Sequence, residues 1–238
     1  MPDLHLGTWV KSSGNESVEI MAAAGFDFVV IDLEHAFPTV YPHIVTAAGR
    51  GVAPLVRVPD HGASMIQRVL DAGAAGVLVP HVDDAAQAAA VAAAVRFPPH
   101  GTRGSGGTSR AAQWGLLDRA EYQRFGNSEA LCIAQLESRT AMANAAEILA
   151  VPGVSAGFVG AADLALDTGL SANDPELQGM VDAALAASQA AGKPIGWAVG
   201  SNPAAARKAF ERGFDFVVMG NDLSMLAETA HSLVADVG

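Results

Sequence analysis

The chain has 238 residues, half of them hydrophobic, and carries a formal net charge of −11 with a single cysteine. The length fits one large domain or two small ones, the negative charge argues against nucleic acid and anionic membranes as partners, and no apolar run reaches the roughly 20 residues of a membrane span. Cys132 excludes an internal disulfide framework and lies in an apolar run typical of inert core. These features predict a cytoplasmic protein.

Short runs of β-forming residues alternate along the chain with alanine-rich stretches of helical period. The predicted strands are Leu4–Val10, Phe28–Ile31, Pro54–Val58, Gly76–Val79, Leu131–Leu136, Ala156–Val159, Pro194–Val199 and Phe216–Met219. The predicted helices lie near 15–24, 39–50, 63–72, 83–95, 139–149, 174–191, 202–212 and 222–235. Such alternation indicates parallel strands joined by crossover helices. Eight units in this length predict an α/β fold, a (β/α)8 TIM barrel over residues 1–238. A doubly wound sheet is the alternative.

Residues 97–127 interrupt this rhythm after the fourth predicted helix. The segment begins with a stretch rich in proline and glycine, and it contains a helical pattern near 116–125. Long loops in compact domains are usually functional or disordered. The helical end favours an ordered excursion from the barrel.

The phrase GFDFVV occurs twice, at residues 25–30 and 213–218. In each copy we expect the glycine to end a helix and the aspartate to precede a strand, which places the shared half at the bottom of the barrel. The copies diverge at the carboxyl end of the strand, where barrel enzymes keep their chemistry. The first continues to Asp32, Glu34 and His35, whereas the second ends in glycine and polar residues.

Polar side chains gather where the predicted strands end, in a chain of which only 16% is charged. They are Trp9 and Lys11, Asp32, Glu34 and His35, Arg57, Gln135 and Glu137, and Asp163. A different position is taken by Asp71, which lies on the third predicted helix just before the turn into strand four. A single charge at a strand end is commonly solvated or capping, but a whole set converging on one face predicts a site.

Glu137 and Asp163 end neighbouring predicted strands, so both carboxylates are expected to reach one ion. Two carboxylates without a cysteine or histidine pair favour a hard cation such as Mg²⁺ or Mn²⁺. Two protein ligands would leave positions for water and a chelating substrate. The alternative is that Glu137 caps the helix near Ser138 and Asp163 caps the turn that follows it.

Three further features suggest roles in catalysis or binding. The stretch Gly160-Ala161-Ala162 reads as a strand-to-helix turn whose free amides can hold a carboxylate. His35 is a candidate general base, because its unperturbed pKa lies near neutrality. Arg57 can stabilise a developing oxyanion, or it can form an ion pair inside the barrel mouth.

Taken in order, a series of short motifs resembles the HpcH/HpaI aldolase family, the metal-dependent pyruvate aldolases. They are Gly7-Thr8-Trp9, Gly25-Phe26-Asp27 running to Asp32-Leu33-Glu34-His35, Val56-Arg57-Val58-Pro59, Leu70-Asp71-Ala72-Gly73, Val79-Pro80, Pro99 with Gly101-Thr102-Arg103-Gly104, Gln135-Leu136-Glu137 and Gly160-Ala161-Ala162-Asp163-Leu164. Each motif is weak by itself, but the ordered set is strong and covers nearly the whole chain.

The resemblance implies reversible cleavage of a 2-keto-4-hydroxy acid to pyruvate and an aldehyde. It implies that Glu137 and Asp163 hold a divalent metal, Mg²⁺ or Mn²⁺ with Co²⁺ or Zn²⁺ as alternatives, which stabilises the pyruvate enolate as a Lewis acid. Arg57 would support the same oxygen. His35, coupled to Asp71, would handle protons.

The same resemblance implies the substrate-binding groups and the assembly. Amides near Gly160 and Ala162 would bind the carboxylate, Gln135 would lie beside the metal, and Trp9 would line the pocket. Family members form hexamers built from dimers, so we expect the last helix, Asp222–Val234, to pack on a neighbouring subunit.

Two residues depart from the family pattern. Ala161 replaces a proline before the metal aspartate, which loosens the turn but leaves its amides available. His81 stands where methionine is common, and together with the 97–127 excursion it leaves the aldehyde open.

Three other functions remain open on the sequence. A Schiff-base aldolase would need a lysine in the barrel mouth, and Lys11 alone is suitably placed. A phosphate-handling barrel could use Gly200-Ser201-Asn202 and Gly220-Asn221-Asp222, which follow strands seven and eight. A non-catalytic ligand-binding barrel would keep the fold without the chemistry.

Overall fold

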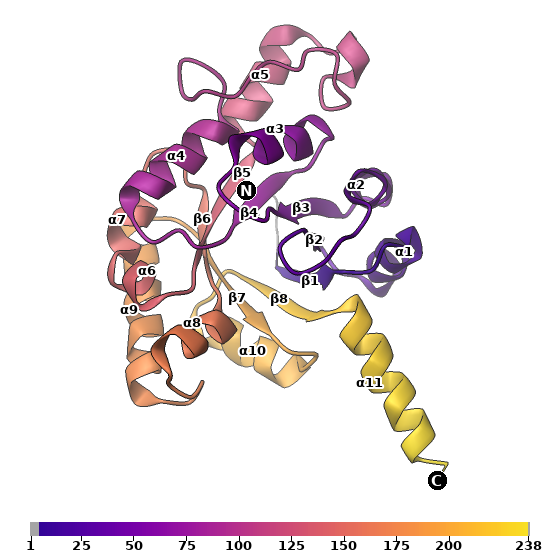
Figure 1. The fold of residues 1–238 in the computed structure, drawn as a ribbon, viewed down its shortest axis with the longest axis vertical. Coiled ribbons are helices and arrows are strands. Elements are labelled where there is room, and N and C mark those ends of the chain that lie inside the picture. The colour runs from indigo at the N-terminus through magenta and orange to yellow at the C-terminus, as the bar shows by residue number, and fades with distance from the viewer. Residues whose placement is uncertain (1–4, 238) are drawn as a thin grey trace.

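The computed structural model describes residues 5–237 and contains a closed barrel of eight parallel strands (Figure 1). The strands are β1 (Leu6–Val10), β2 (Phe28–Asp32), β3 (Ala53–Arg57), β4 (Gly76–Val79), β5 (Leu131–Leu136), β6 (Ala156–Val159), β7 (Ile195–Val199) and β8 (Phe216–Asn221). Each strand pairs with the next along the chain, and β8 pairs with β1. The (β/α)8 prediction is therefore confirmed, and the doubly wound alternative is wrong because the sheet closes. Leu4, predicted to begin the first strand, lies outside the described residues.

Helices follow the strands and cover the outside of the barrel. They are α1 (Asn15–Ala24), α2 (Val40–Gly49), α3 (Ala63–Asp71), α4 (Ala85–Val95), α5 (Arg119–Ser128), α6 (Arg139–Ala143), α7 (Ala145–Ala150), α8 (Ala161–Thr168), α9 (Pro175–Ala191), α10 (Pro203–Arg212) and α11 (Asp222–Ala235). The helix predicted over 139–149 is two helices that meet at Asn144. The sequence pattern missed α8, because eight residues span only about two turns and give little periodicity.

Apolar side chains form two layers on the two faces of the strands. One set fills the barrel and includes Phe28, Leu55, Ile133, Phe158 and Phe216. A larger set lies between the strands and the surrounding helices. Strands buried on both faces explain why the sequence shows continuous apolar runs rather than alternation.

The repeated phrase GFDFVV forms the same structure in both places. Gly25 and Gly213 end α1 and α10 with φ of 95° and 108°, a left-handed conformation that glycine adopts without strain. Asp27 accepts a hydrogen bond of 2.8 Å from the first amide of β1, and Asp215 accepts one of 2.8 Å from the first amide of β7. Each copy therefore fixes the start of its own strand against the start of a neighbouring one.

The phenylalanines of the two copies meet inside the barrel. Phe28 and Phe216 are in an edge-to-face contact with ring centroids 6.1 Å apart. Each ring lies against a glycine of an adjacent strand, since a β-carbon on Gly7 or Gly196 would come within 2.3 Å of it. The repeated sequence therefore contributes side chains to the barrel interior near the amino-terminal ends of the strands.

Residues 97–127 leave the barrel between α4 and β5 and include a short 3₁₀ turn, Gln113–Gly115, and all but the last residue of α5 (Figure 1). The excursion has its own small apolar cluster of Phe97, Ala112 and Tyr122. Arg103 is buried there and donates to Asp71 at 2.7 Å and to Tyr122 at 3.2 Å. The segment is therefore anchored to the end of α3.

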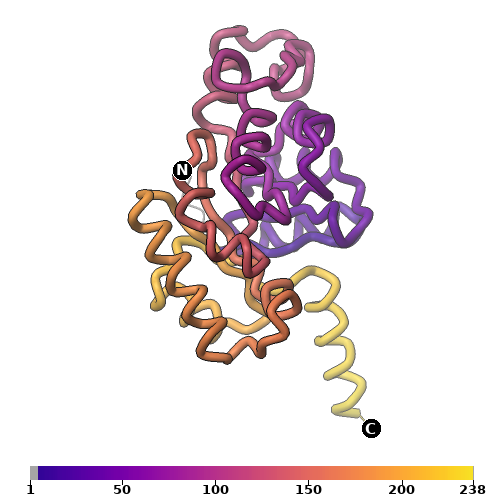
Figure 2. Tube along the Cα trace, turned by 60° about the vertical axis from the view of Figure 1, so that its left-hand side comes forward, coloured from indigo at the N-terminus to yellow at the C-terminus, as the bar shows by residue number. Residues whose placement is uncertain are grey.

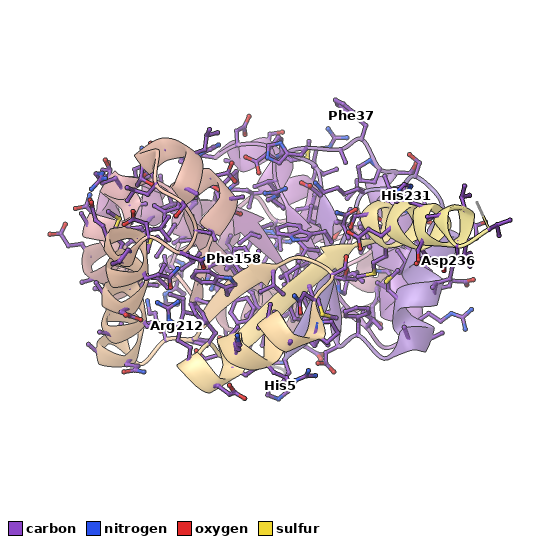
Figure 3. All side chains as sticks on the ribbon, turned by 90° about the horizontal axis from the view of Figure 1, so that it is seen from below. His5, Phe37, Phe158, Arg212, His231 and Asp236 are labelled. Carbon is purple, nitrogen blue, oxygen red and sulfur yellow. The ribbon has the colours of Figure 1, made fainter. Side chains whose placement is uncertain are left out.

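The last helix, α11, extends away from the barrel in Figures 1 and 2. It begins at the end of β8, where Asp222 is buried, and carries exposed apolar side chains further on, among them Leu226 and Leu233. His231 and Asp236 mark this projecting part in Figure 3. None of the helices in the described range 5–237 is long and apolar enough to cross a membrane.

Candidate active site

Alternation of side chains along the strands places the predicted site residues together. Phe28, Leu55 and Phe158 point into the barrel, so the residues two or four positions further along the same strands also point inward, at its carboxyl end. In this way Asp32 and Arg57 come to lie opposite each other on β2 and β3. The mouth of the barrel is therefore polar above an apolar floor.

A pocket of about 360 Å³ opens at this end. The predicted residues that line it are Trp9, His35, Arg57, Gln135, Gly160, Ala161, Ala162 and Asp163. Phe158, which is labelled in the barrel interior in Figure 3, forms part of its floor. The structure therefore brings these residues together, while their individual roles stay predictions.

Asp32 is the centre of an ion-pair network at one wall of the pocket. Its carboxylate accepts two hydrogen bonds from Arg57, at 2.9 and 2.7 Å, and lies 3.1 Å from the ammonium of Lys11. Arg57 also forms an ion pair with Glu34 at 2.8 Å, and its guanidinium lies 4.3 Å from the centre of the Trp9 ring. Arg57 is thus fixed in orientation.

The protonation of Asp32 follows from these contacts. Complete burial by itself raises the pKa of this carboxyl, but the hydrogen bonds and charge of Arg57 outweigh burial and lower the pKa below its ordinary value. Asp32 therefore stays ionised at neutral pH. Lys11, the candidate for a Schiff base, lines the pocket, but its ammonium is in the ion pair with Asp32.

Glu137 is buried at the end of β5 and held from two sides. One carboxylate oxygen accepts from the backbone amide of His81 at 2.7 Å, and the other accepts from the side-chain amide of Gln135. Burial raises the pKa of Glu137, and these hydrogen bonds offset it only in part. The side-chain oxygen of Gln135 is buried without a hydrogen-bond partner among the described residues. Such a group is satisfied by a ligand or an ion.

Three side chains lie close enough to share a cation. Glu34, His81 and Glu137 each offer a ligand atom within 4.8 Å of the others. The two ring nitrogens of His81 lie 3.0 Å from Glu137 and 3.2 Å from Glu34. Of these three, only Glu137 was predicted from the sequence as a metal ligand, and His81 was noted only as a departure from the family pattern. Asp163, the other predicted ligand, lines the pocket but is outside this group.

The turn after β6 has the form that the sequence predicted. Helix α8 begins at Ala161 without a side-chain cap, so its first amides face the pocket without an internal partner. The backbone comes very close to the neighbouring strand, because a β-carbon on Gly160 would lie 2.8 Å from the β-carbon of Glu137. The helix terminus and the buried carboxylate therefore share one small space.

Asp71 is not brought to His35 within the chain. It lies at the end of α3, where it accepts from Arg103 and from the hydroxyl of Tyr122 at 3.0 Å. His35 instead lies 3.7 Å from Glu34, and its backbone amide donates to Asp32 at 3.3 Å. The proposed coupling of Asp71 to proton transfer is thus absent from the contacts of the described chain.

Several pocket residues, among them Ser201 and Glu228, were not predicted as site residues from the sequence. Ser201 follows β7 and Glu228 lies on the second turn of α11, and both line the pocket. Ser201 belongs to a glycine turn that was considered only for phosphate. Glu228 has no local signal, because a glutamate on an exposed helix is common.

A parallel barrel with buried acids, an oriented arginine and a free helix N-terminus around one pocket has the site of a barrel enzyme that handles a small anion. Comparison with known proteins defines it further. The chain belongs to the HpcH/HpaI aldolase/citrate lyase family, whose model matches residues 5–229. The resemblance read from the ordered motifs is confirmed, and the chain is an aldolase-type lyase of this family.

The relatives are similar over nearly their whole length. A hydroxypyruvate/pyruvate aldolase of Chromohalobacter salexigens is 39% identical, with 98% of this chain and 93% of the relative covered. A 2-dehydro-3,6-dideoxy-6-sulfogluconate aldolase of Pseudomonas putida is 36% identical, with 96% and 91% covered. The crystal structure of an HpcH/HpaI aldolase from Desulfitobacterium hafniense superposes with a TM-score of 0.93 at 29% identity, with 99% and 93% covered.

Proposed function

We propose that the protein is a divalent-metal-dependent aldolase that reversibly cleaves a 2-keto-4-hydroxy acid to pyruvate and an aldehyde. The observation that carries the proposal is the meeting of an uncapped helix N-terminus, at Ala161, with the buried carboxylate of Glu137 across Gly160. The first suits the carboxylate of pyruvate, and the second suits a cation beside its keto oxygen.

The donor groups fit a divalent metal. Glu137 is a carboxylate whose pKa is raised by burial and by the nearby charge of Glu34, and Gln135 has a buried side-chain oxygen beside it without a partner among the described residues. Oxygen donors of this kind suit Mg²⁺ or Mn²⁺. A bound metal would supply Lewis-acid stabilisation of the charge that develops on the keto oxygen.

We place the metal between Glu137 and Asp163 rather than between Glu34 and His81. Arg57 lies 2.8 Å from Glu34 and neutralises it, so a cation there would meet a guanidinium at close range. Asp163 lies in the first turn of α8, on the side of the pocket where the free amides are. Family resemblance supports the same pair.

The protein groups around pyruvate then have separate tasks. The amides of Ala161 and Ala162 bind the carboxylate, and Arg57, held by Asp32, donates toward the keto oxygen. His35 stands at the pocket edge and carries the proton, directly or through water. Trp9 helps to hold the Arg57 guanidinium in place by a cation–π contact.

The enolate step can be tested without knowing the aldehyde. The methyl protons of pyruvate should exchange with deuterated water in an NMR assay, stop exchanging with EDTA, and recover with Mg²⁺ or Mn²⁺. Exchange that persists in EDTA would point to an imine on Lys11. Absence of exchange under every condition would reject the proposal.

The location of the metal needs its own test. Binding of Mn²⁺, followed by electron paramagnetic resonance or calorimetry, should weaken in Asp163→Asn and in Glu137→Gln. The variant His81→Ala removes a ligand of the other cluster, so a loss confined to His81→Ala and Glu137→Gln would move the metal to Glu34 and His81.

We also propose a homo-oligomer, a hexamer by family resemblance, in which α11 packs on a neighbouring subunit. The support is the direction of α11 away from its own barrel and the exposure of Leu226, Leu233 and Val234 along it (Figure 2). The cytoplasm is the proposed location, as the low cysteine content suggests.

A further inference from the structure

The pocket has a second half, which the groups proposed for pyruvate leave free. It is built by the ends of β7 and β8 and by α11, with Ser201, Asn221, Ser224 and Glu228 on its wall and Ala198 toward its floor. It is continuous with the half around α8. With pyruvate bound at the start of α8, as proposed above, a molecule placed here would lie next to it in the same pocket.

The helices that start near this second half have side-chain caps, which occupy amides that an anion would otherwise use. At the start of α10, the side chain of Asn202 accepts from the amides of Ala204 and Ala205, at 3.0 and 3.1 Å. At the start of α11, Asn221 accepts from the amide of Ser224 at 2.8 Å in a capping box. Asn202 and Asn221 thus accept from amides in the first turns of both helices, whereas α8 has no such side-chain cap.

Charge in the second half is negative. Glu228 projects from α11 into the lining, and no lysine or arginine stands among the residues that line this half. The nearest cation in the pocket, Lys11, is bound to Asp32. The carboxylate of Asp222, the first residue of α11, accepts hydrogen bonds from the backbone amides of Lys11 and Ser12 at 2.9 and 3.1 Å. A carboxylate or phosphate would meet the negative charge of Glu228 without a compensating positive charge.

Ser201 supplies the attractive group. Its hydroxyl oxygen is buried without a hydrogen-bond partner among the described residues, and a β-carbon on Gly220 would lie 2.8 Å from it. The hydroxyl is therefore packed close to Gly220, in a residue that lines the pocket, and its hydrogen-bonding capacity is unused. The serine hydroxyl can donate to a hydroxyl of a ligand, and a carboxylate can accept from that ligand hydroxyl.

We propose that this half binds the aldehyde partner and selects a short, uncharged aldehyde that carries a hydroxyl group, through Ser201 and Glu228. The inference rests on the proposed function and deepens it. A pocket of about 360 Å³ is near the small end of ligand sites, which limits the aldehyde to a few carbons beside pyruvate.

The proposed aldol reaction needs no reactant other than pyruvate and the aldehyde. In the condensation direction, a proton leaves the methyl carbon of pyruvate, that carbon bonds to the aldehyde carbon, and the aldehyde oxygen takes up one proton to become the 4-hydroxyl. Cleavage runs the same steps in reverse. No electrons are gained or lost overall, so selectivity depends only on how the aldehyde is held.

The experiment compares aldehydes in the full-length protein with pyruvate and Mn²⁺. The parent should use glyceraldehyde and glycolaldehyde with a higher kcat/KM than succinic semialdehyde or glyceraldehyde 3-phosphate. In Glu228→Lys, the kcat/KM ratio of the anionic aldehydes to the neutral ones should rise about tenfold, because a repulsive charge becomes attractive. Glu211→Lys, the same change at an exposed position of α10, should leave the ratio at the parental value.

A second variant tests the hydroxyl. In Ser201→Ala, the kcat/KM ratio of glycolaldehyde to acetaldehyde should fall by about five- to tenfold, the effect of one lost hydrogen bond. Each ratio is measured within one variant, so any effect on the shared pyruvate step cancels.

The outcomes separate the two proposals. A parent without pyruvate proton exchange fails at the proposed function, before any aldehyde is added. A parent that exchanges pyruvate protons but prefers the anionic aldehydes, or ratios that stay unchanged in both variants, would overturn the aldehyde inference alone.

Discussion

Asp32→Asn should destabilise the protein strongly, because it breaks a buried ion pair from one side. Asp32 is fully buried and the Arg57 side chain is 6% exposed, so the variant leaves a guanidinium out of water with a neutral partner. Breaking such a pair costs roughly 3–5 kcal/mol. Arg57 keeps its 2.8 Å contact with Glu34, which argues for the lower end, about 3 kcal/mol.

The loss can be measured by thermal unfolding followed by tryptophan fluorescence, since Trp9 lies directly against the guanidinium. In a chain of this size a loss of about 3 kcal/mol lowers the unfolding midpoint by about 6–12 °C. Asp182→Asn is a matched control, because Asp182 pairs with Arg212 at 2.7 Å on the surface, and it should cost less than about 1 kcal/mol. Equal losses in the two variants would refute the reasoning.

The same pair predicts the direction of a pH effect. The pKa of Asp32 is lowered in the folded state, so its stabilisation is present above the unfolded-state value near 3.8 and is lost as the pH falls through the lower, folded-state value. The stability difference between the parent and Asp32→Asn should therefore be constant from neutral pH to about pH 5 and shrink only in stronger acid. A difference that vanished near pH 6 would contradict this assignment.

Four further changes test other parts of the molecule. Asp163→Asn should weaken Mn²⁺ binding more than about tenfold in calorimetry, and an unchanged affinity would remove Asp163 from the metal site. Gly160→Ala should slow pyruvate proton exchange more than about tenfold, because its new β-carbon would lie 2.8 Å from that of Glu137; an unchanged rate would show that the turn can move aside. Leu226→Glu should lower the molar mass in light scattering by placing a charge on the exposed face of α11, and an unchanged mass would place the contact elsewhere. Burial raises the pKa of Cys132 to about 11, so the thiol should resist a disulfide reagent at pH 8 until the chain is unfolded, and rapid labelling of the folded protein would contradict its burial.

The strands could be predicted from the sequence because they are short, continuous and buried on both faces. β2 and β6, for example, begin at the predicted residues, and β6 also ends at its predicted residue. The pocket residues at the strand ends could be predicted for the same reason, since parallel strands deliver their carboxyl ends to one face. Side-chain alternation then decides which of them point inward.

Contacts between segments that are distant in the chain could not be predicted from local sequence patterns. The partner of Asp71 is Arg103, 32 residues further on in an irregular excursion, and no local pattern ties the two together. His81 faces both Glu34 and Glu137 because its backbone adopts a positive φ of 55°, which is uncommon for histidine. Strain of this kind is supported by the surrounding structure, so neither composition nor periodicity reveals it.

Helix caps explain how one pocket can distinguish two substrates. Glycine at position 160 leaves the first amides of α8 without a side-chain acceptor, whereas asparagine at positions 202 and 221 satisfies those of α10 and α11. An anion therefore gains hydrogen bonds on one side of the pocket and gains none on the other. If Asn221→Gly uncapped α11, the second half would acquire free amides, and the kcat/KM for an anionic aldehyde should rise relative to a neutral one. An unchanged ratio would mean that Glu228, rather than the caps, sets the polarity of this half.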